Sequence, residues 1–461
     1  MNDFQSRIFD PELIKRFDVS GPRYTSYPTA DRFHEAFEPA GLVRTLRERK
    51  GNERPISLYF HIPFCDTVCY YCACNKVITK DRGRADRYLD YLSREMELIA
   101  KELSGSRSVA QLHLGGGTPT FLTDAQMRRL FAQINEHFTL TDDGEYSVEL
   151  DPRRVSRETI GLLAELGLNR MSVGVQDFDP RVQKAVNRIQ SVEETNNVID
   201  AARESGFRSV SMDLIYGLPL QTLDSVSATL DAVLGIAPDR IALYNYAHLP
   251  TRFMPQRRIK EEELPSADEK LRILGMAIDK LEQAGYVYIG MDHFARPDDE
   301  MAIAQREGRL HRNFQGYSTH AGCDLLSFGI SAIGMTEGLY TQNVKTLDAY
   351  YEALDKGELP VARGYRMDQD DGVRYAVIQS LMCDFALSLR EIEQRWGLRF
   401  DAYFARELDE LRAMAAAGLC EITPDEIRVT ERGRLLVRVI AMVFDRHLHE
   451  HRTGAKYSKV I

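Results

Sequence analysis

The sequence predicts an α/β fold: a partial (β/α) barrel with an N-terminal arm and a smaller, mainly helical C-terminal domain. From about residue 55, short β-branched and apolar runs alternate with longer amphipathic helical patterns, which is typical of βαβ units and a parallel sheet. Within the runs, polar and apolar residues alternate, which indicates a sheet with two different faces. After about residue 360 the pattern becomes helical and highly charged. The expected parts are an arm over 1–50, the barrel over 51–300, a barrel extension over 301–360 and the C-terminal domain over 361–461.

The first 50 residues have weak periodicity and contain the segment Gly21-Pro22-Arg23-Tyr24-Thr25-Ser26-Tyr27-Pro28. Its prolines and glycine disfavour a regular element. We therefore expect an arm without helix or strand in this part of the chain.

Six runs are candidate strands of the barrel, with amphipathic helical patterns between them. Three helix starts carry a Ser or Thr followed three positions later by Gln or Glu, a pair that can form a capping box. These pairs are Thr123 with Gln126, Ser191 with Glu194, and Ser266 with Glu269. The strand candidates are Ile56–Ile62, Val109–Leu114, Tyr146–Leu150, Met171–Val175, Ser209–Ile215 and Ile241–Tyr246, and 286–291 is a candidate for a further strand.

The alternation within the strands bears on function. Side chains two positions apart share a face of a strand, and here one face is apolar while the other is polar. Buried polar groups need hydrogen-bond partners, so a polar barrel interior indicates water and ligand inside. A sheet with one solvated face is the alternative, but crossover helices must cover the apolar side, which favours the ligand-filled barrel. The polar face consists of Tyr59, His61, Gln111, His113, Ser147, Glu149, Asp151, Ser172, Gly174, Gln176, Ser209, Ser211, Asp213, Tyr244, Tyr246 and His248.

Composition and charge exclude several classes of protein. The net charge of -10 argues against general nucleic-acid binding, which requires a basic surface. The N-terminus has no apolar h-region of a signal peptide, and no apolar run reaches about 18 residues, so we expect a cytoplasmic protein without a membrane span. Four of the seven cysteines lie between positions 65 and 74, which indicates metal or redox chemistry rather than disulfides.

Cys65, Cys69 and Cys72 form a C-x3-C-x2-C triplet in the loop after the first strand, where the active sites of such barrels lie. Three thiolates from one short loop can hold a four-iron cubane and leave one iron open to another ligand. Structural zinc is the alternative, but it requires four ligands in two separated pairs, and no second pair follows. Cys74 is either a spare thiol or a hydrogen-donating or second-sphere thiol near the active site. We interpret the remaining cysteines as buried core thiols: Cys323, Cys383 and Cys420.

Glycines and polar residues mark the ends of the following strands. Gly115-Gly116-Gly117-Thr118-Pro119-Thr120 follows the second strand, where glycines let a ligand approach the backbone closely, although a tight turn is the more usual reason for such a run. Any one of the carboxylates at the later strand ends could merely cap a helix. Together they converge on one rim of the barrel, which is harder to explain by helix capping alone. They are Glu149 and Asp151 on the third strand, Gln176 on the fourth with Arg188 after it, and Asp213 on the fifth.

In these features the chain resembles the radical S-adenosylmethionine (SAM) superfamily, down to the aromatic Tyr71 before the last cysteine of the triplet. The resemblance implies that Cys65, Cys69 and Cys72 hold a [4Fe–4S] cluster whose open iron is chelated by SAM. It further implies that one electron from a low-potential cluster cleaves SAM to a 5′-deoxyadenosyl radical.

The chain resembles the oxygen-independent coproporphyrinogen III oxidase family over nearly its whole length. The resemblance implies that two propionates of coproporphyrinogen III are oxidatively decarboxylated to vinyls, giving protoporphyrinogen IX, after a hydrogen is taken from the propionate β-carbon. A reducing protein of the flavodoxin or ferredoxin type is the expected electron donor, and a monomer is the expected state. The matching segments are Gly21–Pro28, Tyr59–Cys65, Cys72–Cys74, Gly115–Thr120, Ser172–Asp177, Met212–Pro219, Asn313–Thr319 and Tyr457–Ile461.

The same resemblance assigns residues to two SAM molecules and to catalysis. The cluster-bound SAM would contact Tyr59, Tyr71, Gly116, Glu149 and Ile333, and the second SAM would contact Gly117, Thr118, Gln176, Arg188, Asp213 and Ala247. Tyr59, His61 and Cys74 are the candidate catalytic residues, since His61 shares a strand face with Tyr59. The four substrate carboxylates require basic partners. Candidates are Arg23 and the run Arg252, Arg257, Arg258 and Lys260, for which solvated surface charge is the alternative. We also expect the N-terminal arm to close the active site, with Arg23 pairing with a propionate and Tyr24 and Tyr27 covering a face of the tetrapyrrole; a structural strap along the barrel is the alternative.

Two other functions compete with this interpretation. A radical SAM haem chaperone would share the cysteine triplet, but such relatives lack the Cys74 extension and the 21–28 segment that are present here. In a zinc-binding structural protein the polar face would be incidental. The acquisition of iron and acid-labile sulfide under anaerobic conditions separates the zinc protein from the other two.

Overall fold

The structure is a computed structural model that describes residues 7–49, 54–320, 322–450, 457 and 459. The chain divides into two compact units, each described here by itself. Unit 1 comprises Met1–Arg32, Ser266–Ala321 and Met367–Ile461, and unit 2 comprises Phe33–Pro265 and Gly322–Arg366. Of the C-terminal segment 457–461 expected from the resemblance, Ser458, Val460 and Ile461 lie outside the described residues.

Unit 2 is built on one large sheet, in which the strands from β13 to β8 run parallel and β14 to β16 are antiparallel. The strands of unit 2 follow one another in the order β16-β15-β14-β13-β1-β4-β5-β6-β7-β8. A mainly parallel sheet with crossover helices confirms the predicted α/β fold and all six predicted barrel strands. The strands are β1 Ile56–Ile62, β4 Ser108–Gly116, β5 Thr139–Leu150, β6 Arg170–Gln176, β7 Ser209–Tyr216, β8 Arg240–Asn245, β13 Asp324–Phe328, β14 Ile333–Thr336, β15 Leu339–Asn343 and β16 Val361–Arg366.

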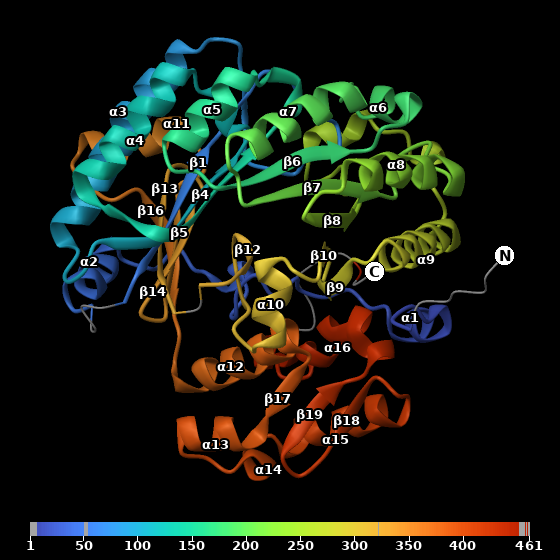
Figure 1. The fold of residues 1–461 in the computed structure, drawn as a ribbon. Coiled ribbons are helices and arrows are strands. Elements are labelled where there is room, and N and C mark those ends of the chain that lie inside the picture. Colours follow the sequence, from blue (N-terminus) through green and yellow to red (C-terminus); the bar gives the residue numbers. More distant parts are fainter. Residues whose placement is uncertain (1–6, 50–53, 321, 451–456, 458, 460–461) are drawn as a thin grey trace. The chain divides into compact units, whose positions relative to one another are not determined.

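The crossover helices cover one side of this sheet (Figure 1). The apolar strand residues on that side, such as Leu58, Leu112 and Val173, are fully buried, as the alternation predicted. Thr123 and Ser191 form the predicted capping boxes, which start α4 and α7. The helices are α2 Pro39–Arg47, α3 Gly83–Glu102, α4 Asp124–His137, α5 Arg157–Glu165, α6 Pro180–Ala185, α7 Val192–Glu204, α8 Leu223–Ile236 and α11 Leu347–Asp355.

A seventh parallel strand, β13, pairs with β1 and was not among the predicted strands. It is only five residues long and begins with Asp324, whose carboxylate accepts a hydrogen bond from Arg49 Nε at 2.7 Å in a buried ion pair. A short segment with an acidic first residue gives a weak strand pattern, and its partner strand lies far away in the sequence. Only the tertiary pairing makes it a strand.

The expectation that residues 1–50 hold no regular element was wrong, because the segment contains α1, Pro11–Phe17, and α2. Asp10 caps α1 by accepting the N–H groups of Glu12 and Leu13, and Pro11 occupies the first helical turn, where its missing N–H costs nothing. Each signal is local and short, so it does not appear as periodicity.

The Gly21–Pro28 segment belongs to the interior of unit 1. Tyr24 and Tyr27 are almost completely buried, and the Tyr24 hydroxyl donates to Asp445 Oδ2 at 2.9 Å. Arg438 Nε donates to the Pro22 carbonyl at 2.9 Å. The expectation that these tyrosines cover a substrate face is therefore wrong for this structure, since neither ring is exposed.

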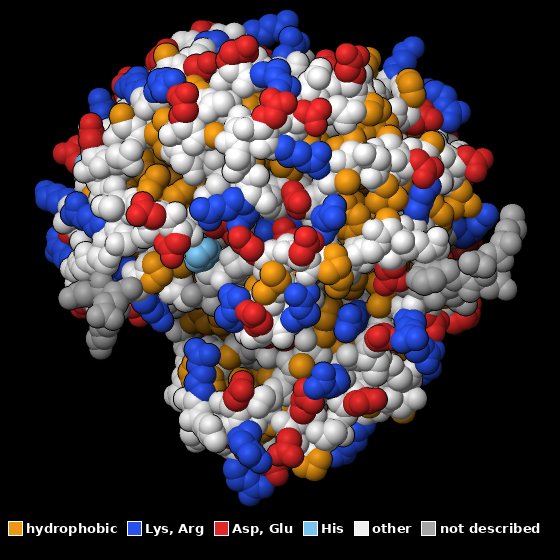
Figure 2. Space-filling model, in the orientation of Figure 1, with side chains coloured by type: hydrophobic (Ala, Val, Ile, Leu, Met, Phe, Trp, Pro, Cys, Tyr) orange, Lys and Arg blue, Asp and Glu red, His pale blue; other side chains and the backbone are white. Residues whose placement is uncertain are grey.

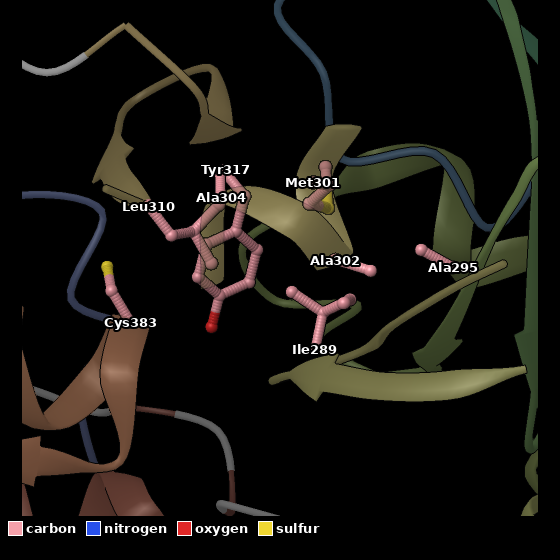
Figure 3. Packing of buried hydrophobic residues seen from close by; sticks show 8 residues of the cluster. All are labelled: Ile289, Ala295, Met301, Ala302, Ala304, Leu310, Tyr317 and Cys383. Atoms are coloured by element: carbon pink, nitrogen blue, oxygen red, sulfur yellow. The ribbon is translucent and has the colours of Figure 1, made fainter. Parts of the chain in front are cut away.

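Unit 1 also contains the predicted strand near 286–291, which is β9, Val287–Gly290, paired with β10, His293–Ala295. Ser266 caps α9, Ala267–Gln283, by accepting the Glu269 N–H, but among the described residues Glu269 does not return the bond that would complete the predicted capping box. One of its hydrophobic clusters is formed by eight residues, in which Tyr317 and Cys383 lie beside α10, Glu300–Arg306 (Figure 3). The other members are Ile289, Ala295, Met301, Ala302, Ala304 and Leu310.

The C-terminal part of unit 1 is mainly helical, with a small sheet in the order β17-β19-β18. Cys383 and Cys420 are buried there, as predicted, whereas Cys323 of unit 2 is only partly buried, so the expectation of a core thiol was wrong for it. The elements are α12 Gln369–Asp384, β17 Ala386–Ser388, α13 Leu389–Trp396, α14 Phe400–Tyr403, α15 Ala405–Ala416, β18 Cys420–Ile422, β19 Glu426–Val429, α16 Val437–Met442 and α17 Arg446–Glu450, and they are preceded by β11 His311–Asn313 and β12 Gly316–Ser318.

Acidic and basic side chains are interspersed on the face of the molecule shown in Figure 2, so the net negative charge does not form one large acidic patch on that face. Within the part of the chain that the structure describes, no helix combines the length and the apolar character needed to cross a bilayer.

Candidate cofactor site

The polar faces of the strands enclose a cavity of about 560 Å³ in unit 2, lined by residues of β4, β5, β6, β7 and β8 and of the cysteine loop. Below it, nearer the amino ends of the strands, the interior is filled by a buried polar layer. Ser57 Oγ donates to Gln111 at 3.0 Å, Gln111 Nε2 donates to Glu145 at 3.2 Å, and Arg170 pairs with Glu145 at 3.3 Å. Polar side chains with partners below and a polar cavity above confirm the predicted polar interior.

The cysteine loop is anchored at both ends beside the cavity. β2, Phe64–Cys65, pairs in parallel with β3, Val77–Ile78, so the chain leaves and returns at the same place. Within the loop, the Tyr70 N–H donates to the Val186 carbonyl at 2.9 Å. Cys65, Cys69 and Cys72 all lie on the cavity wall as a result.

The thiols differ in their electrostatic surroundings. Burial raises the pKa of Cys65 to about 11, whereas a hydrogen bond with Cys74, assisted by Lys76, lowers the pKa of Cys72. The same Cys72–Cys74 hydrogen bond raises the pKa of Cys74, which also lines the cavity. Because thiols bind metal as thiolates, loading a cluster must displace protons from this loop, above all from Cys65.

The glycine-rich loop lies against the start of the cysteine loop. The Gly117 N–H donates to the Ile62 carbonyl at 2.8 Å, and a Cβ on Gly117 would lie 2.6 Å from the Pro63 carbonyl oxygen. Gly116 has φ of +116°, and a Cβ there would lie 2.9 Å from the His61 ring. Both positions therefore require glycine, and their backbone is open to the cavity.

Glu149 and His113 form a pair on the polar face. His113 Nε2 lies 3.2 Å from Glu149 Oε1, and the Gly116 N–H donates to Glu149 Oε2 at 3.3 Å. Burial raises the pKa of Glu149, but the hydrogen bond and the charge of His113 outweigh burial and lower it. Glu149 is thus an ionised hydrogen-bond acceptor on the cavity wall.

Asp213 is in the opposite electrostatic situation. Burial, followed by repulsion from Glu149, raises its pKa to about 7, although Ser172 Oγ donates to its Oδ2 at 2.9 Å. Near neutral pH this carboxyl can therefore either donate or accept a hydrogen bond on the cavity wall.

Arg188 links the cysteine loop to the strand ends. Its Nη1 lies 3.6 Å from Cys69 Sγ and 3.3 Å from Asp151 Oδ2, and its Nη2 donates to the Gly174 carbonyl at 2.6 Å. Its buried Nε has no hydrogen-bond partner among the described residues. Asp151 also accepts from Arg153 Nε, and although burial raises the pKa of Asp151, Arg153 and Arg188 lower it overall.

Tyr59 and His61 lie beside the cavity without being part of its described wall. His61 Nε2 must donate to the Asn75 carbonyl at 2.9 Å, so its Nδ1 accepts from the Tyr59 hydroxyl at 3.1 Å. Burial lowers the pKa of His61, which keeps the ring neutral for this pattern. His61 thereby ties strand β1 to the end of the cysteine loop, and Tyr59 stacks on His113 at 5.9 Å.

Two further predicted cofactor residues are also outside the described wall. Ile333 begins β14, where its carbonyl accepts from Ser327 Oγ at 2.5 Å. The Ala247 carbonyl and the Tyr71 carbonyl both accept from Gln256 Nε2, at 3.3 and 3.0 Å. Among the predicted site residues, those that the structure does bring to the cavity are Cys65, Cys69, Tyr71, Cys72, Cys74, Gly116, Gly117, Thr118, Glu149, Gln176, Arg188 and Asp213.

The basic candidates for substrate binding lie elsewhere. Arg23 pairs with Asp292 inside unit 1, Arg258 lies over the Tyr70 ring, and Lys260 pairs with Glu263. None of them, nor Arg252 or Arg257, is part of the cavity wall formed by the described residues.

The wall includes residues that the sequence interpretation missed: Lys76, Arg153, Arg154, Ile189 and Glu194. The only available signal was the Pro152-Arg153-Arg154 sequence directly after a strand that ends in two carboxylates. Basic residues at strand ends are common on solvated surfaces, so that signal alone does not identify a site.

The residues present fit a cluster and an adenosyl cofactor. Three thiols from one loop are suitable cluster ligands, and the glycine backbone, two carboxylates and the unsatisfied Arg188 Nε provide acceptors and a donor for a charged ligand. Thr118 Oγ1 lies 3.5 Å from Cys65 Sγ, which places the glycine-rich loop next to the thiols.

Comparison with known proteins identifies relatives along nearly the whole chain. Residues 59–233 match the radical SAM superfamily, and residues 367–436 match the HemN C-terminal domain. The oxygen-independent coproporphyrinogen III oxidase of Pseudomonas aeruginosa is 53% identical over 442 residues, covering 95% of this chain and 96% of the relative. The enzyme of the same name from Escherichia coli is 48% identical over 453 residues, 98% of each chain. The solved structure of coproporphyrinogen III oxidase (HemN) from Escherichia coli, described as a radical SAM enzyme, superposes with a TM-score of 0.91 over 95% of this chain and 99% of that chain.

Proposed function

The chain belongs to the oxygen-independent coproporphyrinogen III oxidases of the radical SAM superfamily, and we propose that it carries out this family's reaction at the cavity of unit 2. The enzyme oxidatively decarboxylates two propionate side chains of coproporphyrinogen III to vinyl groups, giving protoporphyrinogen IX. Each propionate loses CO2, one hydrogen atom and one electron. The observation that supports this site most directly is the convergence of three loop thiols, a glycine backbone and two carboxylates on one cavity wall.

When bound, the [4Fe–4S] cluster and SAM supply the one-electron cleavage that generates a hydrogen-abstracting radical. In our proposal Cys65, Cys69 and Cys72 ligate the cluster. Gly116 and Glu149 contact the first SAM, together with Tyr59, Tyr71 and Ile333. The neutral His61 ring holds the Tyr59 hydroxyl and the end of the cysteine loop in place.

We extend the proposal to a second SAM molecule, bound by Gly117, Thr118, Gln176, Arg188, Asp213 and Ala247. The polar wall continues beyond the thiols to the unsatisfied Arg188 Nε and the Asp213 carboxyl, which supports a second charged ligand. Cys74 lies on the same wall, and its hydrogen bond to Cys72 supports a role beside the cluster rather than as a ligand.

The proposal also includes the electron donor, the oligomeric state and the location of the enzyme. A flavodoxin- or ferredoxin-type protein would deliver the electron, and the enzyme would act as a cytoplasmic monomer without nucleic-acid or membrane partners. The net charge of -10 supports the absence of a nucleic-acid partner. Size-exclusion chromatography with light scattering tests the monomer.

An anaerobic assay tests the function. Reconstituted protein with coproporphyrinogen III, SAM and a reductant should release CO2 and 5′-deoxyadenosine and yield protoporphyrin after oxidation of the product. Cys69→Ser is the matched inactive control, because it removes one proposed cluster ligand. Tight porphyrin binding without CO2 release would contradict the oxidase and favour a haem chaperone.

A further inference from the structure

One of the basic side chains on the cavity wall has no partner among the residues that the structure describes. Four basic side chains line the cavity, and three of them are engaged. Arg153 binds Asp151, Arg188 binds Asp151 and the Gly174 carbonyl, and Lys76 donates to the Cys72 and Cys74 carbonyls at 3.2 and 3.3 Å. For the fourth, Arg154, no side-chain hydrogen bond or ion pair is found with any residue that the structure describes.

The backbone at Arg154 is held firmly although its side chain is exposed. Residues Pro152–Arg154 form a 3-10 turn that follows β5, and Asp151 caps it by accepting the Arg153 N–H at 3.2 Å. The Arg154 N–H donates to the Asp151 carbonyl at 3.4 Å. The guanidinium therefore projects from a fixed point on the rim of the cavity, where it remains available to an incoming anion.

An apolar side chain is exposed on the same wall. Ile189 is 68% exposed, while its neighbours Arg188 and Gln190 are only 8% and 4% exposed. Gln190 anchors the segment, because its Nε2 donates to the Val175 carbonyl at 3.0 Å and its N–H to Gln183 Oε1 at 3.2 Å. Ile189 is thus held outward by a well-packed segment, as an apolar contact surface at the cavity.

We propose that Arg154 binds a carboxylate side chain of the tetrapyrrole substrate and that Ile189 packs against its apolar ring system. The inference rests on the proposed function and names the residue that receives one of the four substrate carboxylates. A guanidinium without a partner among the described residues and an exposed aliphatic side chain, both on the wall of one cavity, match an amphipathic anion, and arginine binds carboxylates bidentately. The carboxylate of SAM has the same chemistry, but the proposed SAM residues, such as Arg188 and Asp213, are buried deeper, whereas Arg154 lies on the exposed rim.

Kinetics of Arg154→Gln test the proposal. Loss of a charge-assisted bidentate contact should raise the KM for coproporphyrinogen III about ten- to a hundredfold. Cluster iron and the Kd for SAM, measured by equilibrium dialysis, should stay unchanged. The matched control is Arg157→Gln, an exposed arginine three positions on that pairs with Glu204 and is not on the described cavity wall. Arg154→Lys keeps the charge and should recover part of the affinity, and Ile189→Ser should raise the KM independently.

Binding of a stable porphyrin provides a readout that does not depend on turnover. Wild type should bind coproporphyrin III more tightly than its tetramethyl ester. The ratio of these two affinities should be smaller in Arg154→Gln than in wild type, and it should be unchanged in Arg157→Gln. An equal difference in wild type and Arg154→Gln would overturn the proposal. A loss of SAM affinity in Arg154→Gln with an unchanged porphyrin difference would overturn it in favour of the cofactor carboxylate. Failure of the wild type to release CO2 would count against the proposed function alone, since the binding comparison can still be made.

Discussion

At the scale of single residues, two carboxyl groups on one wall, Glu149 and Asp213, differ in the pH at which they ionise. His113 and the Gly116 N–H keep Glu149 ionised, while burial and the Glu149 charge raise the pKa of Asp213 to about 7. The site can therefore present one fixed acceptor and one group that titrates near neutral pH. Asp213 shares its face with Ser209 and Ser211, so the strand directs it inward.

This difference predicts how SAM binding depends on pH. A ribose hydroxyl donates to an ionised carboxylate more strongly than to a neutral acid. The affinity for SAM should therefore increase as the pH rises through about 7, where Asp213 loses its proton. Asp213→Asn should bind SAM more weakly, with an affinity independent of pH over this range, and should keep its cluster iron. Isothermal titration under anaerobic conditions measures both proteins, and unchanged SAM affinity in Asp213→Asn would count against the assigned face.

The cysteines give a second prediction at this scale. Ser substitution of Cys65, Cys69 or Cys72 should abolish cluster iron after anaerobic reconstitution, because each removes one of three thiols that share a loop and a cavity wall. Cys420→Ser is the control, since Cys420 is buried in the small sheet of unit 1. Loss of iron in Cys420→Ser together with normal iron in Cys69→Ser would reverse the assignment.

Residues whose role follows from their spacing in the sequence could be predicted. Residues whose role depends on which side chains surround them in the fold could not. The cysteine triplet and Gly116 follow from spacing and backbone geometry, and the structure places both at the cavity. Arg154 and Ile189 look like ordinary surface residues in the sequence. Only the cavity shows that Arg154 is a cation without a partner among the described residues and that Ile189 is an exposed aliphatic side chain on the same wall.

At the scale of elements, a buried carboxylate on α3 fixes the turn between β13 and β14. Glu95 accepts the Gly329 N–H at 2.8 Å, Asn343 Nδ2 at 2.6 Å and the Tyr350 hydroxyl at 2.5 Å. Tyr88, also on α3, donates to the His61 carbonyl at 2.8 Å and accepts the Ile330 N–H at 3.0 Å. The seventh strand thus joins the sheet through contacts to residues far away in the sequence, which is why strand periodicity did not identify it.

Glu95 predicts a pH-dependent stability. Burial raises its pKa from 4.5 to about 7 despite three donors, so the folded protein holds its proton more tightly than the unfolded chain does. The resulting stabilisation is fully present below the unfolded pKa and is lost as the pH rises through about 7, an effect of roughly 3 kcal/mol. The Glu95→Gln side chain does not titrate, so it contributes no such pH dependence. Its amide group leaves one hydrogen-bond donor without a matching acceptor, which lowers the free energy of unfolding by about 1–3 kcal/mol at every pH.

Melting temperatures measured from about pH 5 to about pH 8 test whether the stabilisation by Glu95 is lost as the pH rises. The variant should melt below wild type at the acid end, and the difference should shrink as the pH rises. Glu97→Gln, an exposed position on the same helix, is the matched control and should follow wild type throughout. A difference between wild type and Glu95→Gln that grows with pH would show that the carboxylate is preferentially ionised in the folded state.

At the scale of the whole molecule, neither compact unit is a continuous stretch of the chain. Unit 1 collects residues from the beginning, the middle and the end of the chain, whereas every residue of the cavity wall lies in unit 2. The domain limits expected from changes in sequence pattern follow the chain continuously and stay a prediction. Composition and periodicity along a sequence cannot show that residues near 20 are enclosed by residues near 440. That enclosure depends on tertiary contacts such as those of Arg438 with Gly21 and Pro22.

The expectation that the N-terminal arm closes the active site also stays a prediction, and deletion of residues 1–30 is a poor test of it. The deletion removes Tyr24 and Tyr27, and each large buried side chain lost costs about 3–5 kcal/mol. Arg23→Gln is the sharper variant, because it removes the ion pair with Asp292 and leaves both tyrosines in place. If the arm closes the site, turnover of coproporphyrinogen should fall while the melting temperature and cluster iron remain near wild type; full turnover would exclude a role for Arg23.

The deletion instead predicts a change confined to unit 1. Because the Gly21–Pro28 segment is mostly buried in unit 1 and residues 7–30 contribute nothing to the cavity wall described for unit 2, deleting residues 1–30 should unfold one unit selectively. Limited proteolysis with mass spectrometry should find early cuts within 266–320 and 367–450, while the segment 54–265 persists. Tyr24→Phe, which removes only the hydrogen bond to Asp445, is the mild control and should retain the wild-type cleavage pattern within a stability loss of about 1 kcal/mol. Equal cleavage rates across both ranges would mean that the units unfold together, and the interior position of Tyr24 and Tyr27 would then stabilise the whole chain rather than unit 1.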